Sequence, residues 1–318
     1  MKLNRIMGLT PSKESEPIAT GFKRLDSVTC GLRIGEISTI AGRPGMGVTA
    51  FCMSLLRNIG VLQKVPTAYL SLALNELEIA RRLKASLTGR WVSDEKMMPP
   101  KEVINVFEEI GFHLRDVQDN EQAAIELMKA APVWIEHDLG VTMNEIISRM
   151  ERLHQENHVR LFFIDSFRDI LLDSKFLEQS QEIVKLRQAA SRLNVSVVLT
   201  TSLNRSVETR GGSKRPMLSD LRDWGHLETY SSLVMLIYRP EYYMIETFED
   251  DSPATGMADI MIEKDCYGHS GNVRMRFDNH HTSFENDEGF VDAGSYEKTM
   301  PFNENDLLST KINSDFPF

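Results

Sequence analysis

A glycine-rich segment near the N-terminus has the residue types that hold a phosphate group. An expected strand, 36–40, leads into the sequence AGRPGMGVTAF, which then enters an expected helix. Its glycines allow tight turns that aim backbone amides at an anion, and the following helix adds the positive end of its dipole. A threonine hydroxyl after the last glycine is placed to hold Mg²⁺. The segment therefore predicts a nucleotide-binding loop made of Gly42, Arg43, Pro44, Gly45, Met46, Gly47, Val48 and Thr49.

The loop departs from the usual phosphate motif at one position. The motif ends Gly-Lys-Ser/Thr, and Val48 occupies the lysine position here. A charge-assisted hydrogen bond contributes about 1.5–3 kcal/mol, so its loss predicts triphosphate binding that is weaker by about ten- to a hundredfold. Arg43 would replace the lysine only if its side chain folded inward. Taken alone, the segment is equally compatible with a tight strand-to-helix connection that binds nothing.

Short β-branched apolar runs alternate with helical patterns, which is typical of a parallel sheet with crossover helices. Expected strands span residues 36–40, 67–72, 133–136, 161–165, 196–200 and 233–238. Expected helices span residues 49–62, 76–87, 101–109, 143–157 and 179–193. Two later runs, 258–264 and 272–277, predict a β-hairpin that extends the sheet. We therefore expect an α/β fold with a mainly parallel twisted sheet, flanking helices and a C-terminal hairpin.

Composition narrows the class of protein. The 318 residues, 42% of them apolar, suffice for one large domain. No apolar run is long enough to cross a membrane and the N-terminal segment lacks a signal peptide, so we expect a cytoplasmic protein. A net charge of −10 implies that any DNA contact is local. We expect a flexible leader at 1–17, one domain at 18–285 and an acidic flexible tail at 286–318.

Several segments resemble, in order, the C-terminal ATPase domain of the bacterial replicative DNA helicase DnaB family, which has a RecA-like P-loop NTPase core. The similarity extends from about Thr20 to Phe284 and includes TGFKRLDSVTCGLRIGEISTIAGRPGMG, VRLFFIDSF, SVVLTTSLNRSVETRGGSKRPMLSDLRDWGHLE, SLVMLIYRPEYY and ADIMIEKDCYGHSGNVRMRF. The resemblance implies a site for ATP or ADP with Mg²⁺, in which Asp165 and Thr49 hold the metal. It also implies that Arg239 lies near the nucleotide base.

Departures from the family pattern fall at catalytic positions. Ala73 stands where the family has the glutamate that polarises the attacking water, and Ser202 stands at the family's sensor glutamine. Glu76 and Glu78 follow on the expected helix, but a shift of two or more residues moves a carboxylate away from the reacting water. The resemblance therefore implies weakened nucleotide binding with impaired or absent hydrolysis.

The expected hairpin matches the family in part. Lys264 corresponds to the lysine of a pair that enters the neighbouring subunit's site, whereas Cys266 replaces the arginine of that pair. We expect the family's N-terminal collar domain to be absent, because only about nineteen residues precede the similar region. Assembly would then rest on core interfaces, in a homo-hexamer or in a ring with helicase subunits.

Basic residues are better retained in the segments that face single-stranded DNA in the family. Such loops contact the nucleic-acid backbone independently of sequence. A solvated surface turn is the simpler interpretation of the same charges. The resemblance implies DNA-binding roles for Arg205, Arg210, Lys214, Arg215, Arg222, Asp223 and Gly225.

The sequence ends NSDFPF after an acidic stretch, which resembles the C-terminal tip of bacterial single-stranded-DNA-binding proteins. The last aromatic ring would fill an apolar pocket of a partner, and the terminal carboxylate would meet a basic residue. The expected partner-binding residues are Asp315, Phe316, Pro317 and Phe318.

Three functions are compatible with the sequence. The leading one is a DnaB-like protein that binds single-stranded DNA, can bind ATP with Mg²⁺ but hydrolyses it poorly, and regulates or scaffolds DNA replication. The second is an active ATP-dependent 5'–3' DNA helicase whose site is rebuilt from unusual residues. The third is a protein-binding RecA-fold module without nucleotide. ATPase activity separates the first two, and nucleotide affinity separates the first from the third.

Overall fold

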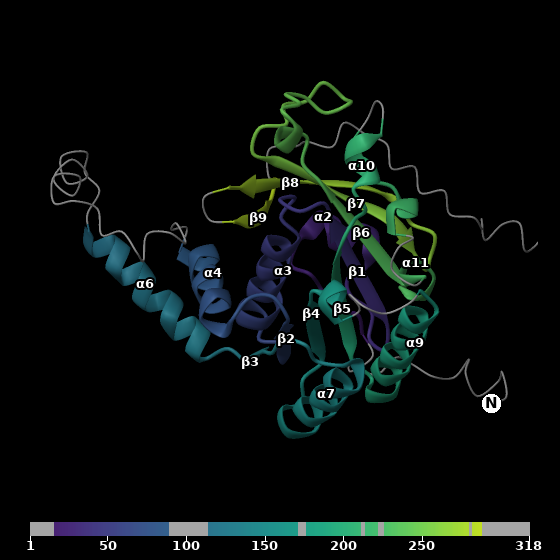
Figure 1. The fold of residues 1–318 in the computed structure, drawn as a ribbon. Helices are drawn as coiled ribbons and strands as arrows, with labels where there is room; N and C mark the ends of the chain where they lie inside the picture. Colours follow the sequence, from purple (N-terminus) through teal and green to yellow (C-terminus); the bar gives the residue numbers. More distant parts are fainter. Residues whose placement is uncertain are drawn as a thin grey trace, which may run out of the picture. The chain divides into compact units, whose positions relative to one another are not determined.

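One mixed sheet organises the described part of the chain. The computed structural model describes residues 16–88, 114–170, 176–210, 214–221, 226–279 and 282–287. Within them, nine strands form a sheet in the order β3-β2-β4-β5-β1-β6-β7-β8-β9 (Figure 1). The first six strands in this order, β3 through β6, are parallel to one another. The last three, β7, β8 and β9, are antiparallel to their neighbours. Their bounds are β1 (Ile37–Gly42), β2 (Thr67–Ser71), β3 (Val133–His137), β4 (Leu161–Asp165), β5 (Ser196–Ser202), β6 (Leu233–Tyr238), β7 (Met257–Asp265), β8 (Gly271–Asp278) and β9 (Ser283–Asn286).

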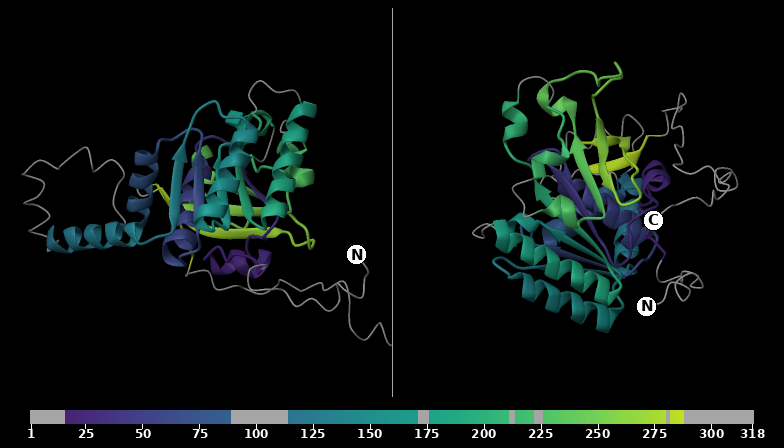
Figure 2. Two further views of the ribbon diagram at one scale, coloured as in Figure 1. Left: turned by 90° about the horizontal axis from the view of Figure 1, so that it is seen from below. Right: turned by 90° about the vertical axis from the view of Figure 1, so that its right-hand side faces the viewer.

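Helices pack on both faces of this sheet. Consecutive residues along a strand point to opposite faces, so apolar strands present side chains to both layers of helices. Phe163 of β4 joins a cluster with α2, α3 and α4, whereas Phe162 joins a second cluster with α7 and α9. Figure 2 shows α7 and α9 side by side. The longer helical segments are α2 (Lys23–Thr29), α3 (Val48–Leu56), the π-helix η2 (Arg57–Leu62), α4 (Glu76–Thr88), α6 (Leu114–Lys129), α7 (Met143–Asn157) and α9 (Phe176–Leu193). The short ones are α8 (Phe167–Ile170), α10 (Ser206–Thr209), η4 (Leu218–Leu221), α11 (Leu227–Tyr230) and η5 (Pro240–Tyr243).

The predicted fold class is confirmed. Strands β4 and β6 and helix α7 have the predicted bounds, and the predicted hairpin is β7 with β8. The expected helix 49–62 is instead α3 followed by the π-helix. The patterns missed α2, α6 and β9, and the expected helix 101–109 lies outside the described residues. No helix among the described residues has the length and apolar character needed to cross a membrane.

Strand β9 closes the sheet at a position where the sequence analysis expected the tail to begin. Its Phe284 is fully buried, with its ring centroid 5.1 Å from that of Phe51 on α3 and 4.8 Å from that of Phe277 on β8. The Phe284 amide donates to Ser54 Oγ at 2.9 Å, and Arg57 donates to the Phe284 carbonyl. The edge of the sheet is therefore anchored to the helix that follows the glycine loop.

A buried polar cluster links three central strands. Tyr69 of β2 donates its hydroxyl to Asp165 Oδ2 at 2.5 Å, and Thr200 of β5 donates to Asp165 Oδ1 at 2.6 Å. All three residues are buried. Burial, reinforced by the nearby Asp165 charge, raises the pKa of the Tyr69 hydroxyl well above its ordinary value. The cluster fixes both oxygens of a carboxylate at the carboxyl end of β4.

Phe284→Ala should destabilise the protein by about 3–5 kcal/mol, because it leaves a cavity beside the Phe51 and Phe277 rings. Chemical denaturation monitored by circular dichroism measures the free energy of unfolding. Met244→Ala is the matched control, because Met244 is 93% exposed and its truncation should change stability by less than about 0.5 kcal/mol. Equal stabilities of the two variants would contradict the packing role of β9.

The buried tyrosine predicts a pH dependence of stability. A raised folded-state pKa means that the unfolded chain loses the Tyr69 proton first, so this contribution is complete below about pH 10 and declines as pH rises. Unfolding free energies measured between pH 8.5 and 11.5, a range on the order of one unit to either side of the ordinary tyrosine value, should therefore fall more steeply for the unaltered protein than for Tyr69→Phe. Parallel pH profiles would show that Tyr69 titrates normally.

Candidate functional site

The loop between β1 and α3 turns tightly at the carboxyl edge of the parallel strands. The loop begins at Gly42, the last residue of β1, and ends at Gly47, after which α3 starts at Val48. Gly45 and Gly47 have φ angles of +86° and +95°, which side-chain-bearing residues rarely adopt. A Cβ atom on Gly47 would lie 3.1 Å from the Phe277 ring. Glycine is therefore required at this turn by backbone conformation and by packing, and the amides of the first α3 turn have no partner within the helix.

A cavity of about 620 Å³ opens beside this loop, a volume typical of small-molecule sites. Met46 is buried in the core and does not line it. Thr201, which does line it, has a buried hydroxyl oxygen without a hydrogen-bond partner among the described residues. Its wall brings together the predicted residues Gly42, Arg43, Pro44, Gly45, Gly47, Val48, Thr49, Asp165, Ser202 and Arg239.

Arg239 lies at the end of the cavity formed by the last strands. Its guanidinium donates to the Gly45 carbonyl at 3.1 Å and to Asn279 Oδ1 at 2.7 Å, and it stacks 3.8 Å above the Phe277 ring centroid. Burial lowers the pKa of Arg239. Its Nε has no partner among the described residues. The arrangement places a guanidinium, an aromatic ring and an amide side chain at this end of the cavity.

The lysine position of the loop is apolar and its neighbouring arginine is engaged elsewhere. Val48 is half-buried and packs against the core below the loop. Arg43 donates to Glu208 Oε1 at 2.9 Å and to the Leu203 carbonyl at 2.7 Å. These contacts hold the Arg43 guanidinium toward the segment after β5, although it also lines the cavity.

Asp165 and Thr49 line the same cavity, as a shared Mg²⁺ site requires. Each oxygen of Asp165 already accepts one hydroxyl proton, from Tyr69 or Thr200, which leaves lone pairs for a metal-bound water. Magnesium in nucleotide sites keeps most of its waters and needs few protein ligands. The described residues contain no cluster of three or more His, Cys, Asp or Glu that would bind a metal ion in the absence of a nucleotide. The donor set therefore fits a metal that arrives with a nucleotide.

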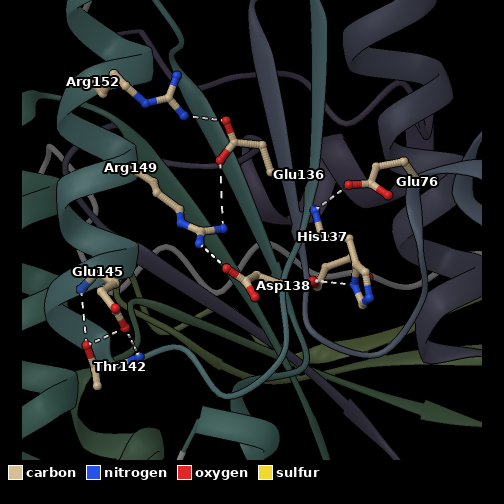
Figure 3. Close-up of polar contacts among 9 residues, drawn as sticks. Glu76, Glu136, His137, Asp138, Thr142, Glu145, Arg149 and Arg152 are labelled. Carbon is tan, nitrogen blue, oxygen red and sulfur yellow. Dashed lines mark hydrogen bonds and ion pairs between the residues drawn. The ribbon is translucent and has the colours of Figure 1, made fainter.

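Ala73 is exposed and does not line the cavity among the residues described. The described carboxylates that line the cavity are Asp165 and Asp169, and Asp169 accepts the Ser166 hydroxyl at 2.7 Å. Glu76 accepts from the backbone amide of His137 at 3.1 Å, and Glu78 pairs with Arg82. Figure 3 shows that Glu76, the first residue of α4, points to His137 at the carboxyl end of β3, next to an ion-pair network between that strand and α7. The network consists of Glu136, Asp138, Arg149 and Arg152. Both glutamates thus serve structural contacts.

The hairpin lysine lies at the opposite edge of the sheet. Lys264 is paired with Val234 near the start of β6, and it donates to the carbonyls of Glu228 and Thr229 at 2.7 and 3.0 Å. Burial lowers the pKa of Lys264. Because β7 is antiparallel, its end points away from this chain's own loop. The exposed Cys266 lies two residues beyond Lys264.

Most of the described cations of the predicted DNA segment contact other groups of the chain. Arg210 pairs with Asp220 at 2.5 Å, and Arg215 pairs with the buried Asp259 at 3.1 Å. Lys214 donates to the carbonyls of Glu208 and Arg210. Arg205 is exposed on the same segment. The remaining predicted DNA contacts, Arg222, Asp223 and Gly225, and the predicted partner-binding residues Asp315, Phe316, Pro317 and Phe318 lie outside the described residues.

Several cavity residues were missed by sequence reasoning. Phe277 lies on β8, and Asn279 and Thr282 lie between β8 and β9. The approach of this hairpin to the glycine loop leaves no local sequence signal. Arg82 and Arg168 also line the cavity. Arg168 follows Asp165 by three residues, and that spacing was the available clue.

Comparison with known proteins assigns these motifs to one family. The model of the DnaB-like helicase C-terminal domain matches residues 17–286. The replicative DNA helicase DnaB of Haemophilus influenzae is 32% identical over 276 residues, which cover 85% of this chain and 55% of that protein. The DnaB of Buchnera aphidicola subsp. Baizongia pistaciae is 30% identical over 287 residues, 87% of this chain and 57% of the relative. The chain thus spans little more than half the length of these relatives.

Solved structures agree with this assignment. One solved ATPase domain has a TM-score of 0.73 and 25% identity, with coverage of 90% of this chain and 95% of that one. A DnaB-like replicative helicase, studied with its primase interactions, has a TM-score of 0.73 and 27% identity over 86% of this chain and 62% of that one. Because the family model covers most of the sequence and includes every strand described above, this chain belongs to the family of DnaB-like helicase C-terminal domains.

Proposed function

We propose that this chain binds ATP or ADP with Mg²⁺ at the glycine loop, hydrolyses ATP poorly or not at all, and acts on single-stranded DNA as a regulator or scaffold of DNA replication. One observation carries the proposal. The cavity keeps the backbone cradle, Thr49 and Asp165, but it lacks a lysine at position 48 and a carboxylate at position 73.

Binding is supported because most of the cradle is backbone. The two positive-φ glycines and the unpaired amides at the start of α3 attract an anion whatever residue occupies position 48. Thr49 and Asp165 would hold Mg²⁺, which when bound offsets charge on the outer phosphates. Arg239 and Phe277 would receive the base.

Hydrolysis is disfavoured by missing side chains. A general base typically contributes 10²–10⁴-fold, and Ala73 offers none. Val48 provides no charge for the transition state, and Ser202 is short of the reach of a glutamine. Lys264 remains for a neighbouring subunit, but Cys266 cannot supply a guanidinium. The active helicase with a rebuilt site is the competing enzyme hypothesis, and a protein-binding module without nucleotide is the competing non-enzyme hypothesis.

The proposed DNA contact is local. Arg205 is exposed at the start of the segment whose other cations are paired internally. Assembly as a homo-hexamer, or with helicase subunits, would bring the Lys264 edge to a neighbour's cavity. The terminal residues 315–318 remain a proposed contact for a partner that recognises acidic, aromatic tips.

The Val48→Lys, Ala73→Glu double variant should hydrolyse ATP about tenfold or more faster than the unaltered chain, because it regains a phosphate cation and a base. Steady-state phosphate release with and without single-stranded DNA measures the effect. Val48→Lys with Ala73→Gln is the control, since it restores the charge and a side chain of equal length without the base. Rapid, DNA-stimulated hydrolysis by the unaltered chain would establish the active-helicase alternative.

Arg205→Ala should weaken binding of an oligothymidine and reduce the slope of log K against log salt by about 0.7, as expected for one lost phosphate contact on a single strand. Fluorescence anisotropy across a salt series measures both quantities. Arg192→Ala removes an exposed charge from α9 and should change neither. Arg215→Ala should chiefly lower thermal stability, because the buried Asp259 loses one of its two arginine partners. Identical salt slopes for all variants would count against a DNA role for this loop.

A further inference from the structure

The cavity beside the loop has one arginine that differs from the others. Four arginines line it among the described residues, and three are committed to the chain itself. Arg43 is held by Glu208 and the Leu203 carbonyl, Arg239 by Asn279 and the Gly45 carbonyl, and Arg82 by Glu78. For Arg168, the contact among the described residues is a single long one, from Nη1 to Ser202 Oγ at 3.4 Å. Its guanidinium therefore keeps most of its five donors for another group.

The sheet register places Arg168 on the loop's side of the cavity. It lies in α8, three residues after the end of β4, and β4 pairs with β5. Ser202, its hydroxyl partner, ends β5 and is the register partner of Gly42 on β1. Arg168, Ser202 and Gly42 thus follow one another across the carboxyl ends of three adjacent strands. The guanidinium reaches toward the loop from the strand that also carries Asp165.

We propose that Arg168 is an anion-binding residue of this cavity that contacts the outer phosphates of a nucleoside triphosphate and provides the charge absent at Val48. The inference rests on the proposed nucleotide function. The loop amides would hold the inner phosphates, and Thr49 and Asp165 would hold a metal whose charge offsets that of the outer ones. Arg168 follows Asp165 by three residues and therefore lies at the metal end. A planar guanidinium matches two phosphate oxygens at once, which a lysine does not.

The placement also gives Ser202 a role. Its hydroxyl contacts the Arg168 guanidinium from the neighbouring strand, so it positions the cation rather than the phosphate. The charge thus enters the cavity from β4 and β5, on the side away from Arg239. Arg168 would restore positive charge for phosphate binding, but it would not replace the glutamate that is missing at position 73. This agrees with a cavity that binds a triphosphate and hydrolyses it slowly.

Titration of the purified full chain with MgATP and MgADP, followed by calorimetry, tests the proposal. Arg168→Gln keeps a polar side chain, although a shorter one, and removes the charge. It should weaken MgATP binding by about ten- to a hundredfold and MgADP binding by clearly less, because the γ-phosphate contact is absent from ADP. Arg168→Lys should recover part of the loss. Arg192→Ala removes an exposed charge outside the cavity and should leave both affinities unchanged.

Measuring the effect of Arg168→Gln in a Val48→Lys chain tests whether Arg168 serves the phosphates. In a Val48→Lys chain, the cost of Arg168→Gln should shrink, because two cations that serve the same phosphates are not additive. Full additivity, or an equal loss for MgATP and MgADP, would overturn the role of Arg168. If Arg168→Gln binds MgATP normally while Thr49→Ala does not, the proposed function stands and this inference fails. If the unaltered chain binds neither nucleotide, both fail.

Discussion

The position of β1 between β5 and β6 is the constraint on which the site depends. Its parallel register places Gly42 beside Ser202 on one side and Ile237 on the other, so the glycine turn leaves the sheet at its centre. Asp165 reaches the same edge from β4, one strand further on. Ligands of open parallel sheets bind at such carboxyl edges because loops from separate strands converge there. The cavity is therefore a consequence of strand order before any side chain is considered.

Packing from the end of the chain then fixes the turn. Phe277 and Phe284 close against Gly47, and Arg239 joins the Gly45 carbonyl to Asn279. Residues 194 or more positions away in sequence thus hold the loop in a shape that could receive phosphates. The same contacts hold the loop in the absence of a ligand, so its shape is a property of the packing. The charged side chains that line the cavity are what distinguish a phosphate-binding loop from a tight connection that binds nothing.

Sequence patterns predicted what local rules determine. The β4 and β6 strands are continuous apolar runs buried on both faces, and α7 carries a capping box from Thr142 and Glu145, so their bounds were accessible. Strand β9 was not, because four residues with two buried positions form a strand only when β8 lies beside them. The partner of Arg43 was equally hidden, since Glu208 is 165 residues away. Arg168 was missed because its availability for a ligand becomes evident only once the partners of the other cavity arginines are known.

Binding and cleavage place different demands on this fold, and that difference explains how one can persist without the other. Attraction of a phosphate needs backbone amides, a helix end and a nearby cation, most of which follow from the packing of β1, α3 and β9. Under the proposed function, cleavage would need individual side chains at positions 73, 202 and 266, which contribute little to the core: Ala73 and Cys266 are exposed and Ser202 is half-buried. Substitution there costs the fold almost nothing, whereas substitution of Gly47 or Phe284 disturbs the turn itself. Hydrolysis can therefore be lost by replacing surface-accessible residues while the cradle, held by the core, keeps its shape.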